Sequence, residues 1–241
     1  MDKASDVFLA IGKRPERCLP EKSIWYLLHF KDGYLRRMRE EGLESGLPGI
    51  LGKFEAWLGD HFNVPIQSQS AFHLVDSYAA GSSDAFDKFY ELFGRFSADY
   101  AATDDRLPDD SPTEQTQRHV VPREPKNDLC GILRLIRKNP AMWIGYPHFS
   151  GVHGFLIGYE GAGRDIGLLT TPGEQIFDDF KLWIEKTRFP RGKPRPWFKL
   201  ITFHSSNDSG FTRHGAYVVF FDLLDEFARE LGQPSFFEAC P

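Results

Sequence analysis

The sequence predicts a mainly α-helical protein that consists of two tandem copies of a small helical domain. Apolar residues recur at steps of three and four, which is the helical period. Residues that start and stop helices flank these stretches. The two halves also align with each other over much of their length. An α+β fold is the alternative, because a short strand near Pro196–His204 fits its sequence as well as one helical turn does.

An internal duplication is the strongest of these observations. The segment Phe8–Tyr34 aligns without a gap with Leu133–Tyr159, at a constant offset of 125 residues. Further identical residues follow in the same order along both halves, at slightly larger offsets; they pair Phe54 with Phe180, Trp57 with Trp183, Leu92 with Leu223 and Phe96 with Phe227. Chance rarely preserves such an order. We therefore predict one helical repeat over residues 1–100 and a second over residues 128–241.

The stretch between the repeats, residues 101–127, has the composition of a linker. It contains four prolines and no aromatic residue, and a run of acidic residues lies within it. Such a segment buries too little apolar surface to offset the entropy lost on ordering. We therefore predict a linker here.

The second repeat shows its first two helices clearly. Asp128 can cap a short helix, and Asn139–Pro140 stops it. We expect Met142 and Trp143 to pack into the core after this stop. A second helix follows, whose apolar face comprises Val152, Phe155, Leu156 and Tyr159.

The third and fourth helices carry their own boundary signals. Thr171, Pro172 and Glu174 form the pattern of a capping box with proline at the first helical position. The last helix covers Ala216–Leu231, and Gly232 and Pro234 are typical helix terminators. The equivalent residues of the first repeat follow the same helical period.

Part of the second repeat resembles a small bacterial domain that is commonly encoded beside polymorphic toxins, in the position of immunity genes. The motif I-R-x-x-P-x-M-aromatic-x-G is matched from Ile136 to Gly145, and the terminal helix of the F-x-x-L-L-x-x-F kind is matched from Phe220 to Phe227. The resemblance covers about 100 residues. It implies a non-enzymatic protein that neutralises a cognate toxin domain. The first repeat departs from the motif, with Gly12 in place of the arginine and Arg17 in place of the methionine.

The common motifs of metal, acyl and phosphoryl chemistry are absent from the sequence, so we expect no catalysis, no cofactor and no metal. The three cysteines are scattered and odd in number, which favours a reducing cytoplasm and argues against disulfides. We expect the histidines to lie at the surface or at helix ends, since His148 and His153 have no evident carboxylate partner. No apolar run is long enough to cross a membrane, and no signal peptide opens the chain.

Binding to a toxin requires surface residues that can recognise a protein. Inhibitors of cationic toxins present acidic surfaces, and a few aromatic side chains usually anchor such interfaces. We expect Trp57 and Trp183 to be core residues because they occupy equivalent positions. The candidate contact residues lie in the second repeat; they are Trp143, Tyr146, Asp178, Asp179, Asp222, Asp225 and Glu226.

A nucleic-acid-binding regulator or enzyme is the alternative function. Six basic residues lie from Lys186 to Lys199 with Phe189 and Trp197 among them, a composition that suits single-stranded nucleic acid. Three prolines in the same stretch also fit a solvated loop. The net charge of −5 gives no overall attraction to nucleic acid, so we consider this partner the weaker candidate.

Overall fold

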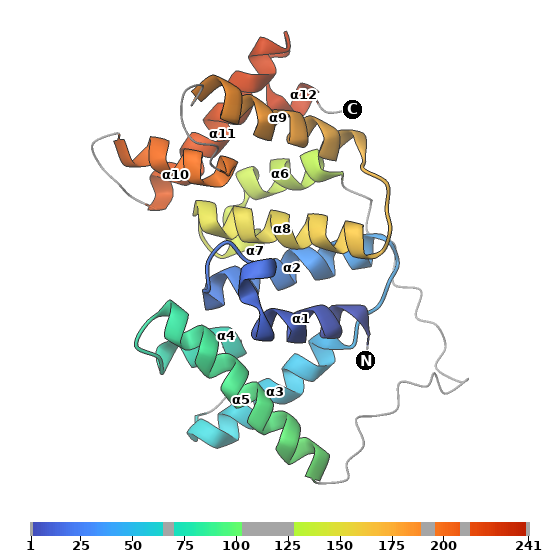
Figure 1. The fold of residues 1–241 in the computed structure, drawn as a ribbon, viewed down its shortest axis with the longest axis vertical. Coiled ribbons are helices and arrows are strands. Elements are labelled where there is room, and N and C mark those ends of the chain that lie inside the picture. Colours follow the sequence, from blue (N-terminus) through green and yellow to red (C-terminus); the bar gives the residue numbers. More distant parts are fainter. Residues whose placement is uncertain (1, 65–69, 103–127, 189–195, 208–212, 240–241) are drawn as a thin grey trace. The chain divides into compact units, whose positions relative to one another are not determined.

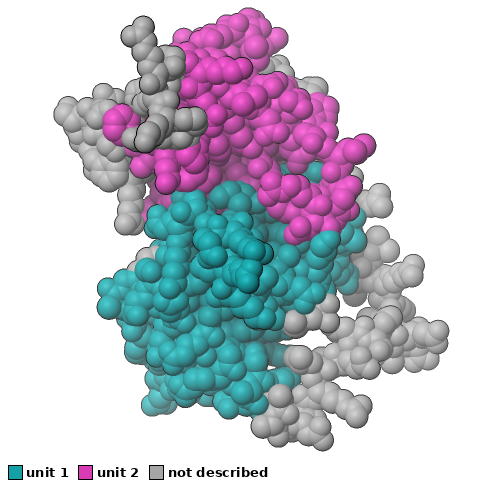
Figure 2. Space-filling model, viewed as in Figure 1, with its two compact units in different colours: residues 1–124, 157–159 teal, residues 125–156, 160–241 magenta. Residues whose placement is uncertain are grey.

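The computed structural model describes residues 2–64, 70–102, 128–188, 196–207 and 213–239. Within these residues every regular element is a helix, so the mainly α prediction is confirmed (Figure 1). The chain divides into two compact units (Figure 2). Unit 1 comprises residues 1–124 and 157–159, and unit 2 comprises residues 125–156 and 160–241. Most of the predicted linker, residues 103–127, lies outside the described residues.

Unit 1 is a helical domain with an aromatic core. Its elements are α1 (Lys3–Lys13), η1 (Pro15–Arg17), α2 (Ile24–Glu40), α3 (Leu47–Phe62), α4 (Ala71–Ser77) and α5 (Ser82–Ala102). Helix α5 packs against α2, α3 and α4. Phe89 of α5 is fully buried, and its ring contacts those of Phe8, Phe54 and Phe72. Contacts between aromatic side chains therefore hold together helices that lie far apart in the sequence.

The remaining helices are α6 (Leu129–Lys138), α7 (Pro140–Ile144), α8 (Phe149–Asp165), α9 (Pro172–Arg188), α10 (Trp197–Asn207), α11 (Arg213–Glu230) and α12 (Phe236–Ala239). They belong to unit 2, except for residues 157–159 of α8. As predicted, the Asp128 side chain caps α6 by accepting a hydrogen bond from the Gly131 amide at 2.7 Å. Helix α9 packs against α6, α10 and α11. Phe180 of α9 is fully buried, and its ring contacts those of Phe220, Phe227 and Phe236.

The two units share an order of elements and several local geometries. Helices α2 and α8 begin and end 125 residues apart, which is the offset of the sequence alignment. Arg14 has φ −148° and ψ 71°, and Asn139, at the same offset, has φ −144° and ψ 71°. After each of these long helices comes a glycine in the left-handed region, Gly42 at φ 72° and Gly167 at φ 73°. These matches support the predicted duplication; the equivalence of the two complete backbones stays a prediction.

The segment Pro196–His204 is helical, so the predicted α+β alternative is wrong. Residues Trp197–Asn207 form α10. Leu200, Ile201 and Ser205 are its buried residues, at steps of one and four that place them on one helical face. The five residues Trp197–Ile201 are too few to reveal this period, and Ser205, which completes the buried face, is polar and lies beyond them.

Burial of the histidines differs from the prediction of surface or helix-end positions. His148 does precede the first residue of α8, but its side chain is only 4% exposed. His29 and His153 lie within α2 and α8 and are 5% and 3% exposed. These two histidines lie among the buried residues of their helices, beside Phe30 in α2 and Val152 in α8.

The prediction that the cysteines form no disulfide is also corrected. Cys130, on α6, is disulfide-bonded, and Cys18 is free. The third cysteine, Cys240, lies outside the described residues. Cys130 is 1% exposed, and its sulfur lies 3.9 Å from the Gly173 carbonyl oxygen at the start of α9. The cross-link therefore has one end inside the core of unit 2.

Reduction should destabilise unit 2. Opening a structural disulfide costs about 2–4 kcal/mol, chiefly because the unfolded chain regains freedom. We expect dithiothreitol to lower the melting temperature of the wild-type protein, as measured by circular dichroism. Cys130→Ser should melt at the lower temperature with or without the reductant. The matched control Cys18→Ser should keep the full response, and loss of the response in this variant would contradict the assignment.

Candidate partner-binding surface

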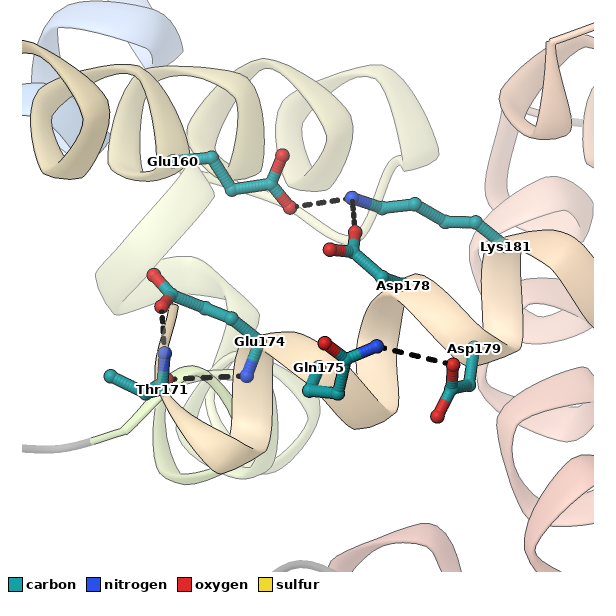
Figure 3. A network of polar contacts seen from close by, with 7 residues as sticks. All are labelled: Glu160, Thr171, Glu174, Gln175, Asp178, Asp179 and Lys181. Atoms are coloured by element: carbon teal, nitrogen blue, oxygen red, sulfur yellow. Dashed lines mark hydrogen bonds and ion pairs between the residues drawn. The ribbon is translucent and has the colours of Figure 1, made fainter. Parts of the chain in front are cut away.

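Helix α9 begins with the predicted capping box (Figure 3). The Glu174 carboxylate accepts a hydrogen bond from the Thr171 amide at 2.7 Å, and the Thr171 hydroxyl accepts one from the Glu174 amide at 3.2 Å. These two bonds satisfy amide groups that lack a partner within the helix. The capping box therefore fixes the first turn of α9, and with it the direction in which the exposed side chains of the helix point.

Two of the predicted contact residues, Asp178 and Asp179, lie exposed on that outer face. Lys181 donates to Asp178 at 2.9 Å and also to Glu160 of α8 at 2.8 Å (Figure 3). Asp179 accepts a hydrogen bond from the neutral Gln175 side chain at 3.3 Å. The charge of Asp178 is therefore partly compensated by a cation, whereas the contact with neutral Gln175 leaves the negative charge of Asp179 in place.

The three predicted acidic residues of α11 have different surroundings. Asp222 is exposed and Glu226 is half-buried. Asp225 forms an ion pair with Arg137 of α6 at 2.8 Å, and it accepts a hydrogen bond from the Phe236 amide of α12 at 3.2 Å. Asp225 thus connects three helices of unit 2, so the structure gives it a stabilising function. A contact of Asp225 with a partner stays a prediction.

This difference gives a direct test. Asp225→Ala should lower the free energy of unfolding by about 1–2 kcal/mol, because the Phe236 amide loses its acceptor and a half-exposed ion pair is broken. Asp222→Ala removes the same charge from the same helix and should change stability by less than about 0.5 kcal/mol. Urea unfolding of both variants measures the two values. Equal effects would contradict the structural role of Asp225.

The predicted aromatic contact residues, Trp143 and Tyr146, lie on α7 and just after it. Trp143 is half-buried, and its ring meets that of Phe155 edge to face at 6.0 Å. Tyr146 is 52% exposed and stacks on His148 at 4.1 Å. Met142 is 75% exposed, which corrects the expectation that it fills the core. Met142 and Tyr146 are therefore exposed, whereas Trp143, which lies between them in the sequence, is held by its contact with Phe155.

His153 lies in an apolar part of the interior of unit 2. Its ring stacks on Phe198 at 4.3 Å and meets the edge of Trp197 at 5.1 Å. Burial lowers the pKa of His153 from 6.5 to about 3, and the positive charge of Lys181 lowers it further in the same direction. The imidazole is therefore neutral at physiological pH and acts as a core aromatic ring.

Sequence reasoning missed a polar link between α9 and α11. The Trp183 indole donates a hydrogen bond to the Glu230 carboxylate at 2.7 Å. Trp57 and Trp183 were both predicted to be core residues, but both are half-buried; the Trp183 ring is stacked on Phe180 at 6.2 Å. The sequence contained one signal for this link: an acidic residue, Asp99, stands in the first repeat at the position aligned with Glu230.

The seven predicted contact residues do not form one continuous stripe. Asp222 and Glu226 lie on the outer side of α11, whereas Asp225 points to α6 and α12. Of the basic loop between Lys186 and Lys199, residues 189–195 lie outside the described residues, and the two end lysines are exposed. Trp197 is a half-buried residue whose ring contacts Phe149, Phe177 and Phe220.

In the residues that the structure describes, no group of three or more histidine, cysteine, aspartate or glutamate side chains is arranged to hold a metal ion. Among the same residues, no helix combines the length and apolarity needed to cross a membrane.

Comparison of the chain with protein-family models, with curated proteins and with solved structures finds no match.

Proposed function

We propose that this protein is an immunity-type inhibitor, which neutralises a cognate bacterial toxin domain by binding to it and without catalysis. The observation that carries the proposal is that two neighbouring helices of unit 2, α9 and α11, both expose carboxylates; they include Asp178, Asp179 and Asp222. Exposed carboxylates on a rigid helical scaffold suit a partner with a basic active site or a basic substrate channel.

The apolar part of the contact would come from α7. Met142 and Tyr146 are exposed, and large side chains of this kind anchor protein interfaces when a partner covers them. Stacking of Tyr146 on His148 holds the ring in one orientation before binding. A side chain that is already ordered loses less entropy when the partner arrives.

Growth rescue tests the proposal. The probe is the C-terminal domain of the large secreted protein that a neighbouring gene would encode. We expect that expression of this domain stops growth, that the present chain restores it, and that the two proteins copurify. Asp178→Lys with Asp179→Lys should weaken rescue, because two carboxylates on the contact face become positive. Glu16→Lys with Glu44→Lys, two exposed acidic residues of unit 1, is the control with the same change in net charge.

Two outcomes would overturn the proposal. The first is that no such gene lies beside this one and that the protein inhibits no toxin domain encoded in the same genome. The other is tight, salt-dependent binding of labelled single-stranded RNA at two salt concentrations, which would favour the nucleic-acid alternative because phosphate contacts release counterions.

A further inference from the structure

The indole–carboxylate link of unit 2 has a counterpart of matching geometry in unit 1. The Trp57 indole donates to the Asp99 carboxylate at 3.1 Å, as the Trp183 indole does to Glu230 at 2.7 Å. Trp57 stacks on Phe54 at 6.1 Å and 21°, and Trp183 stacks on Phe180 at 6.2 Å and 21°. The same hydrogen bond and the same ring stacking thus occur in both units, so each residue around the unit 2 link has an equivalent in unit 1.

The two links differ in charge at the positions one helical turn before each linked residue. Before the tryptophan, unit 1 has Lys53 and unit 2 has Asp179. Before the linked carboxylate, unit 1 has Arg95 and unit 2 has Glu226. Residues three and four apart on a helix are neighbours on its surface. Three residues after the tryptophan the signs are reversed, with Asp60 in unit 1 and Lys186 in unit 2, so cations predominate beside the unit 1 link and carboxylates beside the unit 2 link.

In unit 1 a cation, Lys53, occupies the position that Asp179 has in unit 2. The Lys53 ammonium donates to the Tyr100 hydroxyl at 3.0 Å and lies 5.1 Å from the centre of that ring. The residue that follows the linked carboxylate in unit 2 is Leu231, which is 54% exposed. One turn after the tryptophan, His61 stacks on Trp57 at 4.8 Å, whereas unit 2 has Thr187, which carries no ring.

We propose that the Trp183 patch, defined as Asp179, Trp183, Glu226, Glu230 and Leu231, binds a lysine or arginine side chain of the protein partner. The incoming cation would take the place that Lys53 takes in unit 1. The carboxylates of the patch attract the charge, while Trp183 and Leu231 contact the apolar stem of the side chain. A basic segment of a protein is the partner that this combination of carboxylates and apolar surface fits. The proposal rests on the proposed function and names the part of the toxin that unit 2 recognises.

An octa-arginine peptide is the probe that tests the patch without the toxin. In a heteronuclear NMR titration at low salt, we expect the Trp183 indole N–H signal, assigned with Trp183→Phe, to shift and saturate. The Trp57 indole signal should stay in place, because unit 1 has Lys53 and Arg95 at the positions that Asp179 and Glu226 hold in unit 2. Asp179→Lys with Glu226→Arg recreates the unit 1 charges and should weaken binding at least about tenfold.

Controls separate the patch from bulk charge. Glu16→Lys with Glu44→Arg makes the same change in net charge on unit 1 and should leave the affinity within about twofold. If the doubly reversed variant does not fold, Asp179→Asn with Glu226→Gln removes the two charges without adding new ones. Equal weakening in the patch variant and the control, or no shift of the Trp183 signal in the wild type, would overturn the proposal. Peptide binding without toxin neutralisation would overturn only the proposed function.

Discussion

Lowering the pH from 7 to about 5 should reduce the free energy of unfolding by about 2 kcal/mol through His153 alone. The folded state holds this imidazole neutral, with a pKa of about 3 against 6.5 in the unfolded chain. The unfolded chain therefore binds the proton more readily as the pH falls. Stability is fully present above pH 6.5 and decreases by about 1.4 kcal/mol per pH unit between 6.5 and 3.

Replacement of the imidazole tests this cause. His153→Phe keeps a ring that can stack on Phe198 but has no proton to bind, so its unfolding free energy should change little between pH 7 and about 5. Urea unfolding at the two pH values provides the measurement. His73→Gln, which removes an exposed histidine of unit 1, should keep the wild-type dependence. A dependence that survives in His153→Phe would assign the acid sensitivity to other groups.

The second large effect is expected for Phe180→Ala. Phe180 is fully buried and its ring contacts five other rings, from α9, α11 and α12: Phe177, Trp183, Phe220, Phe227 and Phe236. Truncation of a core phenylalanine costs about 3–5 kcal/mol, because apolar contacts are lost and a cavity remains. That is a large part of the stability of a small domain.

Hydrogen exchange can localise the effect. We expect amide protection in α9 and α11 to fall together in Phe180→Ala, since both helices lose the same contact. Phe203→Ala, on α10, removes a ring that is 44% exposed and should cost less than about 1 kcal/mol. Unchanged protection of α11 in Phe180→Ala would contradict the role of Phe180 as the centre of the unit 2 core.

Much of the fold could be predicted from the sequence because helix signals are local. The Thr171–Glu174 capping box and the Asp128 cap each depend on residues within one turn, and both occur as predicted. The helical period correctly placed Phe180 and Phe220 in the core. It failed for α10, whose buried face is completed by a polar residue, Ser205.

The candidate surface was predicted less well, because the sequence does not say which helix lies beside which. Asp222 and Asp225 are indistinguishable as acidic residues of one amphipathic helix. Only the tertiary fold brings Arg137 of α6 and the Phe236 amide of α12 to Asp225 of α11.

Most helices, their ends and the aromatic residues of the core can be predicted from the sequence alone, since each depends on residues a few positions apart. The contacts of polar side chains between helices depend on the tertiary structure. Examples are the hydrogen bond from Trp183 to Glu230 and the burial of His153 among aromatic rings. Such pairs depend on the rotation and neighbours of whole helices, which are set by the sum of all core contacts and not by any single stretch of sequence.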